Sequence, residues 1–441
     1  MRVLIKNVKI LTMASQSQTV FSGDIGIEDQ RILFVESENS HASKSFVADK
    51  TIDGTNHLAM PGLINAHTHM GMSLLRNYAD DLPLMTWLNE KIWPVEANLT
   101  DEDIYFGTML SIAELIRSGC TTFRDMYFKE EEVAKATTKS GLRANLGLGL
   151  VGVTDPENQL FDKVKALHAS LHNSANGRIR IEVAPHSPYT CSGAYLKTAS
   201  ELAQELDTPL HIHLSESLVE VEESIKQLGK TPIQHVRDLG VFNARTSGAH
   251  CVHLMEQDFE ILKTNQVSVL YNPSSNLKLG NGFANIGRML KEGINVAIGT
   301  DGSSSNNNQN LFEEMHLGAL VNKGIEADPT ALPAYKMLEI ATIGGAKALG
   351  IEQEVGTLEP GKKADLILID LNKPHLTPHH DYVAMLVYSA AGSDVSHMIC
   401  DGAVIMENYQ IKTFDESAII EKASVLAKQL IERSMSKNRE A

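Results

Sequence analysis

The segment Pro61-Gly62-Leu63-Ile64-Asn65-Ala66-His67-Thr68-His69 passes from an apolar run directly into two histidines. Residues 62–65 have the composition of a buried strand, and side chains two positions apart on a strand share a face. His67 and His69 would therefore point the same way at the end of that strand. An HxH pair alone is weak evidence, so its meaning depends on what recurs in the rest of the chain.

Seven more apolar runs of strand length follow this one, and segments long enough for a helix separate them. Repeated βα units with nearly continuous apolar strands predict a closed parallel (β/α)8 barrel, the TIM-type fold of the α/β class. A barrel of about 250 residues leaves room for one accessory domain in a chain of 441 residues. The eight candidate strands are residues 62–65, 121–124, 144–147, 179–183, 210–214, 247–250, 267–270 and 296–299.

The two ends of the chain share a different pattern, in which short predicted strands alternate with polar turns. Neither end carries enough apolar surface to stand alone, so we expect them to pair into one small β-sandwich with the barrel inserted between them. The predicted composite domain comprises residues 1–57 and 356–441, and the catalytic barrel comprises residues 58–355. A C-terminal amphipathic helix at residues 416–440 is expected to pack on the outside.

Charge and hydropathy exclude several classes of partner. The formal net charge is −16 and no basic patch appears, which argues against a nucleic-acid partner and leaves a small-molecule substrate. No run reaches the roughly 18 apolar residues of a membrane span, and the N-terminus lacks the features of a signal peptide. The four cysteines lie far apart, so neither a disulfide framework nor a cysteine metal site is expected. We therefore expect a cytoplasmic protein without membrane association, with a homo-oligomer as the working expectation.

Polar side chains gather at the C-terminal ends of the predicted strands, where barrel enzymes carry their active sites. One histidine or aspartate in such a place is usually a hydrogen-bonded surface group. Independent histidines, however, have no reason to recur at four strand ends of eight, so the recurrence indicates one shared site. Its members are His67 and His69 after the first strand, His186 after the fourth, His213 and Glu216 after the fifth, His250 after the sixth and Asp301 after the eighth.

Three imidazoles and one carboxylate form a suitable shell for a catalytic metal ion that keeps one position open for water. His67 and His69 supply two of the imidazoles, and Asp301 supplies the carboxylate. His211 and His213 share a face of the fifth strand, but His213 lies nearer the catalytic rim and is assigned to the metal. His211 is expected to fill an interior layer below it. One Zn²⁺ per subunit is the favoured ion, with Fe²⁺ or Mn²⁺ as alternatives.

Six motifs extend these observations along the chain: PGLINAHTHMGMSLLRNYADDLPLMTWL, APHSPYTCS, HIHLSES, GAHCVHL, NPSSNLKLGNG and GTDGSSSNN. In order and spacing they resemble the metal-dependent amidohydrolase superfamily, and within it the branch of 5'-methylthioadenosine/S-adenosylhomocysteine deaminases. The resemblance runs nearly end to end, as far as the segment EPGKKADLILID. The superfamily signature is very specific, whereas relatives that act on guanine, 8-oxopurines, pterins and chlorotriazines share much of the branch pattern.

The resemblance implies hydrolytic deamination of an adenine ring, with an inosine-type product and ammonia. Strand four ends in Ala184-Pro185-His186 without a lysine to carbamylate, which implies a single metal ion. Asp301 would take the proton of a metal-activated water while it remains a ligand. Glu216 would protonate the ring nitrogen beside the attacked carbon and then pass a proton to the departing amine. His250 would hydrogen-bond the hydroxide and the tetrahedral oxygen.

The resemblance also implies substrate contacts: Glu96 with the ribose hydroxyls, His186 with the nucleoside, and Trp87 as an aromatic wall. Without the resemblance, Glu96 would be interpreted as an ordinary solvated helix residue, and Trp87 is equally plausible as a core residue. Family members that bind the homocysteine tail do so with arginines after strand three and in the following loop. This chain has Asn-Leu-Gly-Leu-Gly at 145–149 and Asn-Gln-Leu at 158–160. A carboxylate tail would lack its bidentate partner, so we expect methylthioadenosine or adenosine to be preferred over S-adenosylhomocysteine.

Two other functions compete with this interpretation. The first is hydrolysis of another aromatic amidine, such as an oxopurine, a pterin or a chlorotriazine. Glu96 and His186 argue against it, because both match ribose-side contacts. The second is a catalytically inactive barrel that serves in assembly. Such relatives lose metal ligands, whereas this chain keeps all of them together with Glu216 and His250.

Overall fold

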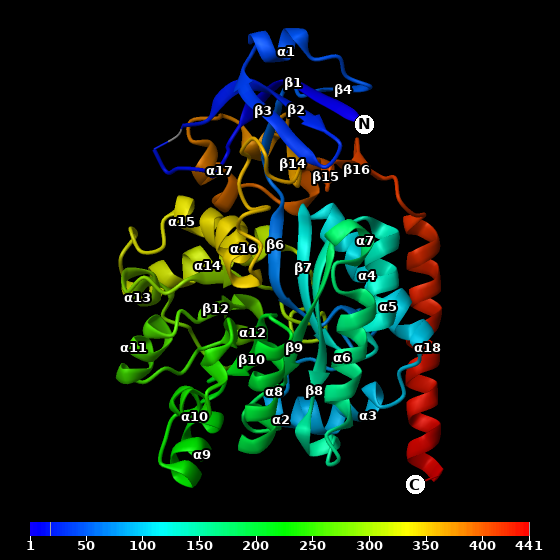
Figure 1. The fold of residues 1–441 in the computed structure, drawn as a ribbon, viewed down its shortest axis with the longest axis vertical. Helices are drawn as coiled ribbons and strands as arrows, with labels where there is room; N and C mark the ends of the chain where they lie inside the picture. The colour runs from blue at the N-terminus through cyan, green and yellow to red at the C-terminus, as the bar shows by residue number, and fades with distance from the viewer. Residues whose placement is uncertain (18, 441) are drawn as a thin grey trace.

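An eight-stranded parallel barrel forms the centre of the computed structural model, which describes residues 1–17 and 19–440 (Figure 1). The strands follow one another in space in chain order, each paired in parallel with the next. The ring is nearly closed. At the junction of the last strand with the first, the backbone N of Asp301 donates a hydrogen bond to the carbonyl of His67 at 2.9 Å. The predicted barrel is therefore confirmed. Its strands are β6 (Leu63–Thr68), β7 (Cys120–Tyr127), β8 (Arg143–Leu150), β9 (Ile179–Pro185), β10 (Leu210–Leu214), β11 (Thr246–His250), β12 (Ser268–Tyr271) and β13 (Val296–Ile298).

Helices separate the barrel strands and cover the outside of the ring (Figure 1). The helix-forming segment after β10 is divided in two, because Gly229 adopts a left-handed φ of 68° and Thr231 caps a new helix. The helices that follow β6 to β13 are α4 (Asp101–Arg117), α5 (Glu130–Ser140), α6 (Gln159–Leu171), α8 (Gly193–Glu205), α9 (Leu218–Leu228), α10 (Pro232–Asp238), α11 (Glu256–Thr264), α12 (Pro273–Lys278), α13 (Ile286–Lys291), α14 (Leu311–Glu326), α15 (Ala334–Glu339) and α16 (Gly345–Leu349).

The two chain ends build one separate sheet together, as the sequence predicted. This mostly antiparallel sheet is joined across the ends by the pairing of β5 with β14, in which Leu58 lies opposite Ile369. Its core mixes residues from both ends, among them Ile5 and Leu366. The division of the chain into two domains near residue 57 stays a prediction. The strands are β1 (Arg2–Ile10), β2 (Phe21–Glu28), β3 (Arg31–Ser37), β4 (Lys50–Asp53), β5 (His57–Pro61), β14 (Leu366–Asp370), β15 (Val395–Cys400), β16 (Ala403–Glu407) and β17 (Gln410–Ile411).

The terminal sheet lies at one end of the barrel, and a run of short helices after β6 lies at the other (Figure 1). That run comprises η1 (Met70–Leu75), α2 (Leu84–Thr86), η2 (Trp87–Ile92) and α3 (Trp93–Glu96). The C-terminal helix α18 (Glu416–Glu440) packs on the outside against α4, where Lys422 pairs with Glu102 at 2.6 Å. None of the helices described is long and apolar enough to span a membrane.

Candidate active site

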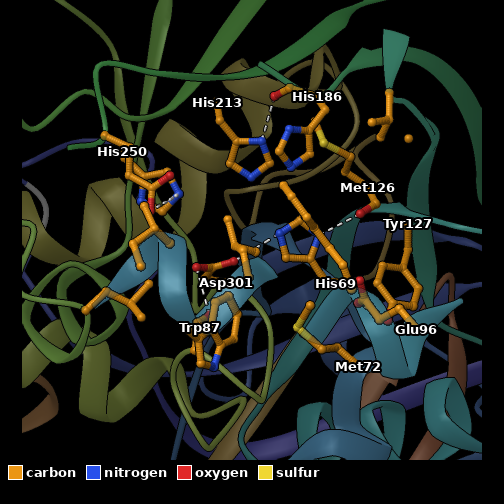
Figure 2. Close-up of a pocket in the computed structure, with 18 of the residues that line it drawn as sticks. His69, Met72, Trp87, Glu96, Met126, Tyr127, His186, His213, His250 and Asp301 are labelled. Atoms are coloured by element: carbon orange, nitrogen blue, oxygen red, sulfur yellow. Dashed lines mark hydrogen bonds and ion pairs between the residues drawn. The ribbon is translucent and has the colours of Figure 1, made fainter. Parts of the chain in front are cut away.

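Three histidines from two strands converge at the end of the barrel that the short helices cover. His67 and His69 come from the end of β6 and His213 from β10, and one ring nitrogen of each lies within 4.8 Å of the others. Asp301 follows β13, and its Oδ1 lies 3.4 Å from His67 Nε2 and 3.1 Å from His69 Nε2. Figure 2 shows His69, His213 and Asp301 turned toward one another. The four predicted metal ligands are thus brought together.

The hydrogen bonds behind two of these rings fix which nitrogen faces the centre. His69 Nδ1 lies 2.6 Å from the carbonyl of Met126, and His213 Nδ1 lies 2.7 Å from the carbonyl of His186 (Figure 2). A carbonyl only accepts, so both rings carry their proton on Nδ1 and leave the Nε2 lone pair free for a metal ion. His67 Nε2 is buried and has no hydrogen-bond partner among the described residues. A nitrogen and carboxylate set of this kind suits zinc.

Asp301 is held as an oriented carboxylate. Its Oδ2 accepts from Ser275 Oγ at 2.6 Å and from Ser305 Oγ at 2.9 Å. Burial opposes its charge, but the imidazoles of His67 and His69 beside it keep the pKa of Asp301 well below its usual range. Its φ of 65° lies in the left-handed region, which is strained for a residue with a side chain. Such a conformation persists only where the surrounding structure holds it.

Glu216 lies in the turn after β10 and faces the same space. Its Oε1 accepts from Asn281 Nδ2 at 2.9 Å and lies 4.0 Å from His250 Nε2. Burial raises the pKa of the Glu216 carboxyl, which favours a protonated acid. The turn is held by Glu220, whose carboxylate accepts from the backbone N of Ser215 at 3.0 Å and of Glu216 at 2.8 Å.

Trp87, Glu96 and His186 line the same cavity as Glu216 and the metal-side residues (Figure 2). Glu96 is buried, and its Oε1 accepts from the Tyr127 hydroxyl at 2.5 Å, so it is not an ordinary solvated helix residue. Burial lowers the pKa of His186 to about 3 and keeps its ring neutral. Trp87 is both core and wall, since it is 4% exposed and still lines the cavity.

Next to this cavity lies an outer hollow of about 400 Å³ whose surface is mainly apolar. Lys129 is the one cationic residue among the described residues that line it, and its ammonium pairs with Asp101. Glu96, Phe128 and Val151 line both the inner cavity and this hollow, so the two adjoin each other. We call this hollow, lined by Trp93, Glu96, Ala97, Leu99, Phe128, Lys129, Val151, Val153 and Thr154, the outer cavity.

A family model of the amidohydrolase family matches residues 58–405. The chain belongs to the amidohydrolase family. It is 50% identical over 435 residues to the 5-methylthioadenosine/S-adenosylhomocysteine deaminase of Thermoanaerobacter pseudethanolicus, which covers 98% of this chain and 100% of that protein. The protein of the same name from Caldanaerobacter subterraneus is 49% identical over 440 residues and covers 99% of this chain and 100% of its own length.

Solved structures of other proteins share the fold of this amidohydrolase. An adenosine deaminase from Xanthomonas campestris with bound zinc superimposes with a TM-score of 0.93 at 33% identity and covers 98% of each chain. The zinc complex of the atrazine chlorohydrolase TrzN from Arthrobacter aurescens has a TM-score of 0.89 at 23% identity and covers 96% of this chain and 100% of that one. The latter likeness concerns the fold alone.

The amidohydrolase also contains supporting residues that sequence reasoning missed. The segment Asn272–Asn281, which includes α12, hydrogen-bonds each of the three predicted catalytic side chains. These residues belong to the motif NPSSNLKLGNG, but no local pattern in the sequence assigns a role to any of them. The pairs are Ser275 with Asp301, Asn276 with His250 at 2.8 Å, and Asn281 with Glu216.

Proposed function

We propose that this amidohydrolase hydrolytically deaminates the adenine ring of nucleosides. It would prefer 5'-methylthioadenosine or adenosine to S-adenosylhomocysteine. The products are the inosine-type nucleoside and ammonia. One observation carries the proposal: the proposed ligands His69, His213 and Asp301 line a single buried cavity with the acid Glu216 and with Glu96. The names of the two bacterial relatives support the same reaction and the same two thioether substrates.

We assign one Zn²⁺ per subunit to His67, His69, His213 and Asp301, with Fe²⁺ or Mn²⁺ as alternatives for the same nitrogen and oxygen set. The unpartnered Nε2 of His67 and the Nδ1 hydrogen bonds of the other two rings support this assignment. When bound, the metal ion supplies a water of lowered pKa and so a nucleophile near neutral pH.

Asp301, Glu216 and His250 then move and hold the protons of the reaction. Asp301 accepts a proton of the attacking water, because its carboxylate is ionised and oriented by Ser275. Glu216, with its raised pKa, donates a proton to the ring nitrogen beside the attacked carbon. The proton of the hydroxyl on the tetrahedral carbon would then pass through Glu216 to the amino group, which leaves as ammonia as the carbon–nitrogen bond breaks and the carbon–oxygen double bond forms. The proton held by Asp301 would restore the acid form of Glu216.

His250 orients the oxygen that attacks the ring. Its Nδ1 donates to Asn276 Oδ1 at 2.8 Å, and this tautomer leaves Nε2 as an acceptor toward the cavity that His250 lines. That nitrogen can accept a hydrogen bond from the attacking water and from the hydroxyl that the attack leaves on the ring carbon.

Substrate recognition divides between the two parts of the cavity. We assign the ribose hydroxyls to Glu96, which Tyr127 holds in place, and a second nucleoside contact to His186. Trp87 forms an apolar wall. The substituent on the ribose would then enter the outer cavity, where apolar side chains suit a methylthio group better than a charged homocysteine tail.

A spectrophotometric panel tests this function directly. The zinc-loaded protein is assayed for loss of the adenine chromophore with methylthioadenosine, S-adenosylhomocysteine and adenosine, and with guanine and a chlorotriazine alongside. We expect turnover of the nucleosides with the highest kcat/KM for methylthioadenosine. If no adenine nucleoside reacts, the proposal is wrong, and activity only on a free base or a triazine would identify the alternative function. Equal kcat/KM for the two thioethers would contradict the proposed tail preference.

A further inference from the structure

His67 is the deepest of the four proposed metal ligands and is held differently from the other two histidines. It is fully buried, and its Nδ1 lies 2.9 Å from Nε2 of His211. The two rings meet edge to face at an interplanar angle of 88°. His69 and His213 instead use backbone carbonyls as partners, and no side-chain substitution removes a carbonyl. Among the three histidines, only His67 thus depends on another side chain for its orientation.

The contact between two imidazole nitrogens fixes the tautomers of both rings. His67 can offer Nε2 to a metal ion only if its proton is on Nδ1, and Nε2 of His211 must then accept that proton's hydrogen bond. A neutral His211 accepts at Nε2 only if its own proton is on Nδ1. That nitrogen lies 3.4 Å from Oε1 of Glu182, at ion-pair distance but without a geometrically good hydrogen bond, and this carboxylate can only accept. The negative charge of Glu182 therefore favours the proton on Nδ1 of His211, and through His211 the proton on Nδ1 of His67.

Glu182, on β9, is anchored inside the barrel by Arg124 from β7, two strands away in the ring. The guanidinium holds both carboxylate oxygens, with Nε 2.6 Å from Oε1 and Nη2 2.8 Å from Oε2, and both side chains are fully buried. Although burial alone would raise it, the charge of Arg124 lowers the pKa of Glu182 to about 2. The desolvation of a buried ion pair offsets most of its attraction, so stability alone is a poor reason for this pair.

We propose that Arg124, Glu182 and His211 form a positioning chain that holds His67 with its proton on Nδ1 and its Nε2 aimed at the metal ion. The inference rests on the proposed function, which makes His67 a ligand. None of the three lines the substrate cavity among the residues described, so they act through His67 and not on the substrate. His211, which was expected only to fill an interior layer below His213, thus supports metal binding through His67.

Zinc affinity, measured without substrate by competition with a fluorescent chelator, is the decisive readout. His211→Met fills a similar volume but gives His67 Nδ1 no strong acceptor, so we expect zinc to bind about 10- to 100-fold more weakly. His211→Gln places an amide oxygen at a similar reach, and we expect it to keep an affinity close to that of the unchanged protein. Ile212→Val is the matched control, because Ile212 lies on the opposite face of the same strand.

Two further measurements separate positioning from packing. With Co²⁺ in place of zinc, His211→Met should change the visible ligand-field bands, and His211→Gln should retain them. If His211→Met proves unstable, the double variant Arg124→Met/Glu182→Met removes both charges together, and its zinc affinity should fall by about tenfold. Unchanged zinc affinity and Co²⁺ spectra in these variants, with only a lower Tm of the metal-free protein, would mean a purely structural role and would overturn the proposal.

The design also distinguishes this inference from the proposed function. If the unchanged protein binds zinc tightly and the variants behave as expected, but no nucleoside is deaminated, the proposed reaction fails and the positioning chain stands. If the unchanged protein binds none of Zn²⁺, Fe²⁺ and Mn²⁺, both are wrong.

Discussion

The inner end of the cavity and the outer cavity are built on opposite principles. At the inner end, Asp301, Glu216 and His250 each accept from or donate to a side chain of the segment after β12, and every such contact is buried. Among the described residues that line the outer cavity, most of the surface is apolar, and the one cation, Lys129, is already paired with Asp101. At the inner end, hydrogen bonds hold polar side chains in fixed orientations, whereas the outer cavity presents a mainly apolar surface.

This difference separates the chemistry from the choice of substrate. A catalytic side chain that is fixed by several buried hydrogen bonds tolerates little change, because a small displacement costs rate. Side chains on exposed loops change at low cost to stability. Val153, for example, is 71% exposed, so a substitution there should alter which substituent is accepted without touching the reaction.

Metal removal should have the largest effect and should act at the inner end alone. A chelator that strips the ion from His67, His69, His213 and Asp301 should abolish deamination of every nucleoside, because no activated water remains. Zinc should restore the rate. The measurement is activity against residual zinc content, and full activity of metal-free protein would exclude a metal-dependent reaction.

Glu216→Gln should lower kcat/KM by about 10³-fold for methylthioadenosine, because an amide cannot donate the acid's proton. Zinc content should be unchanged, since Glu216 is not a proposed ligand. Glu222→Gln makes the same chemical change at an exposed position of α9 and should leave the rate unaltered. A loss of less than tenfold in Glu216→Gln would remove Glu216 from the acid role.

Ser275→Ala should lower kcat by about tenfold, because Asp301 would lose one of the two hydroxyls that orient its Oδ2. KM should change little, since Ser275 does not line the cavity among the residues described. Ser274→Ala, one position earlier, is the control. Equal rates for the two variants would show that Asp301 does not need this hydrogen bond.

Val153→Arg should produce the smallest effect and should act only in the outer cavity. A guanidinium there gives a carboxylate tail a bidentate partner, so the kcat/KM ratio of S-adenosylhomocysteine to methylthioadenosine should rise by about tenfold. Val153→Gln provides similar length without charge and should leave the ratio near its original value. If both variants change the ratio equally, charge does not govern tail selection.

Most of the fold could be predicted from the sequence, because it depends on local patterns. All eight barrel strands contain or overlap the predicted apolar runs, and the short strands of both chain ends meet in one sheet. The side chains that would carry chemistry could be predicted because they follow those runs directly. Ser275, Asn276 and Asn281 could not be given roles, because their partners lie 26 to 65 residues away and only folding brings them together.

By itself, the sequence determined the strand ends, since the period of apolar residues and the polar residue that follows are local properties. It also determined that His211 and His213 share a face. Only the tertiary structure decided what each does, because the depth of a side chain depends on the register of β10 against its neighbours. His213 reaches the rim and donates to the carbonyl of His186, whereas His211 meets His67 and Glu182 inside the barrel. The acceptor for each ring comes from β9 or the residue that follows it, next to β10 in the barrel but in a separate segment of the sequence, so no local pattern encodes it.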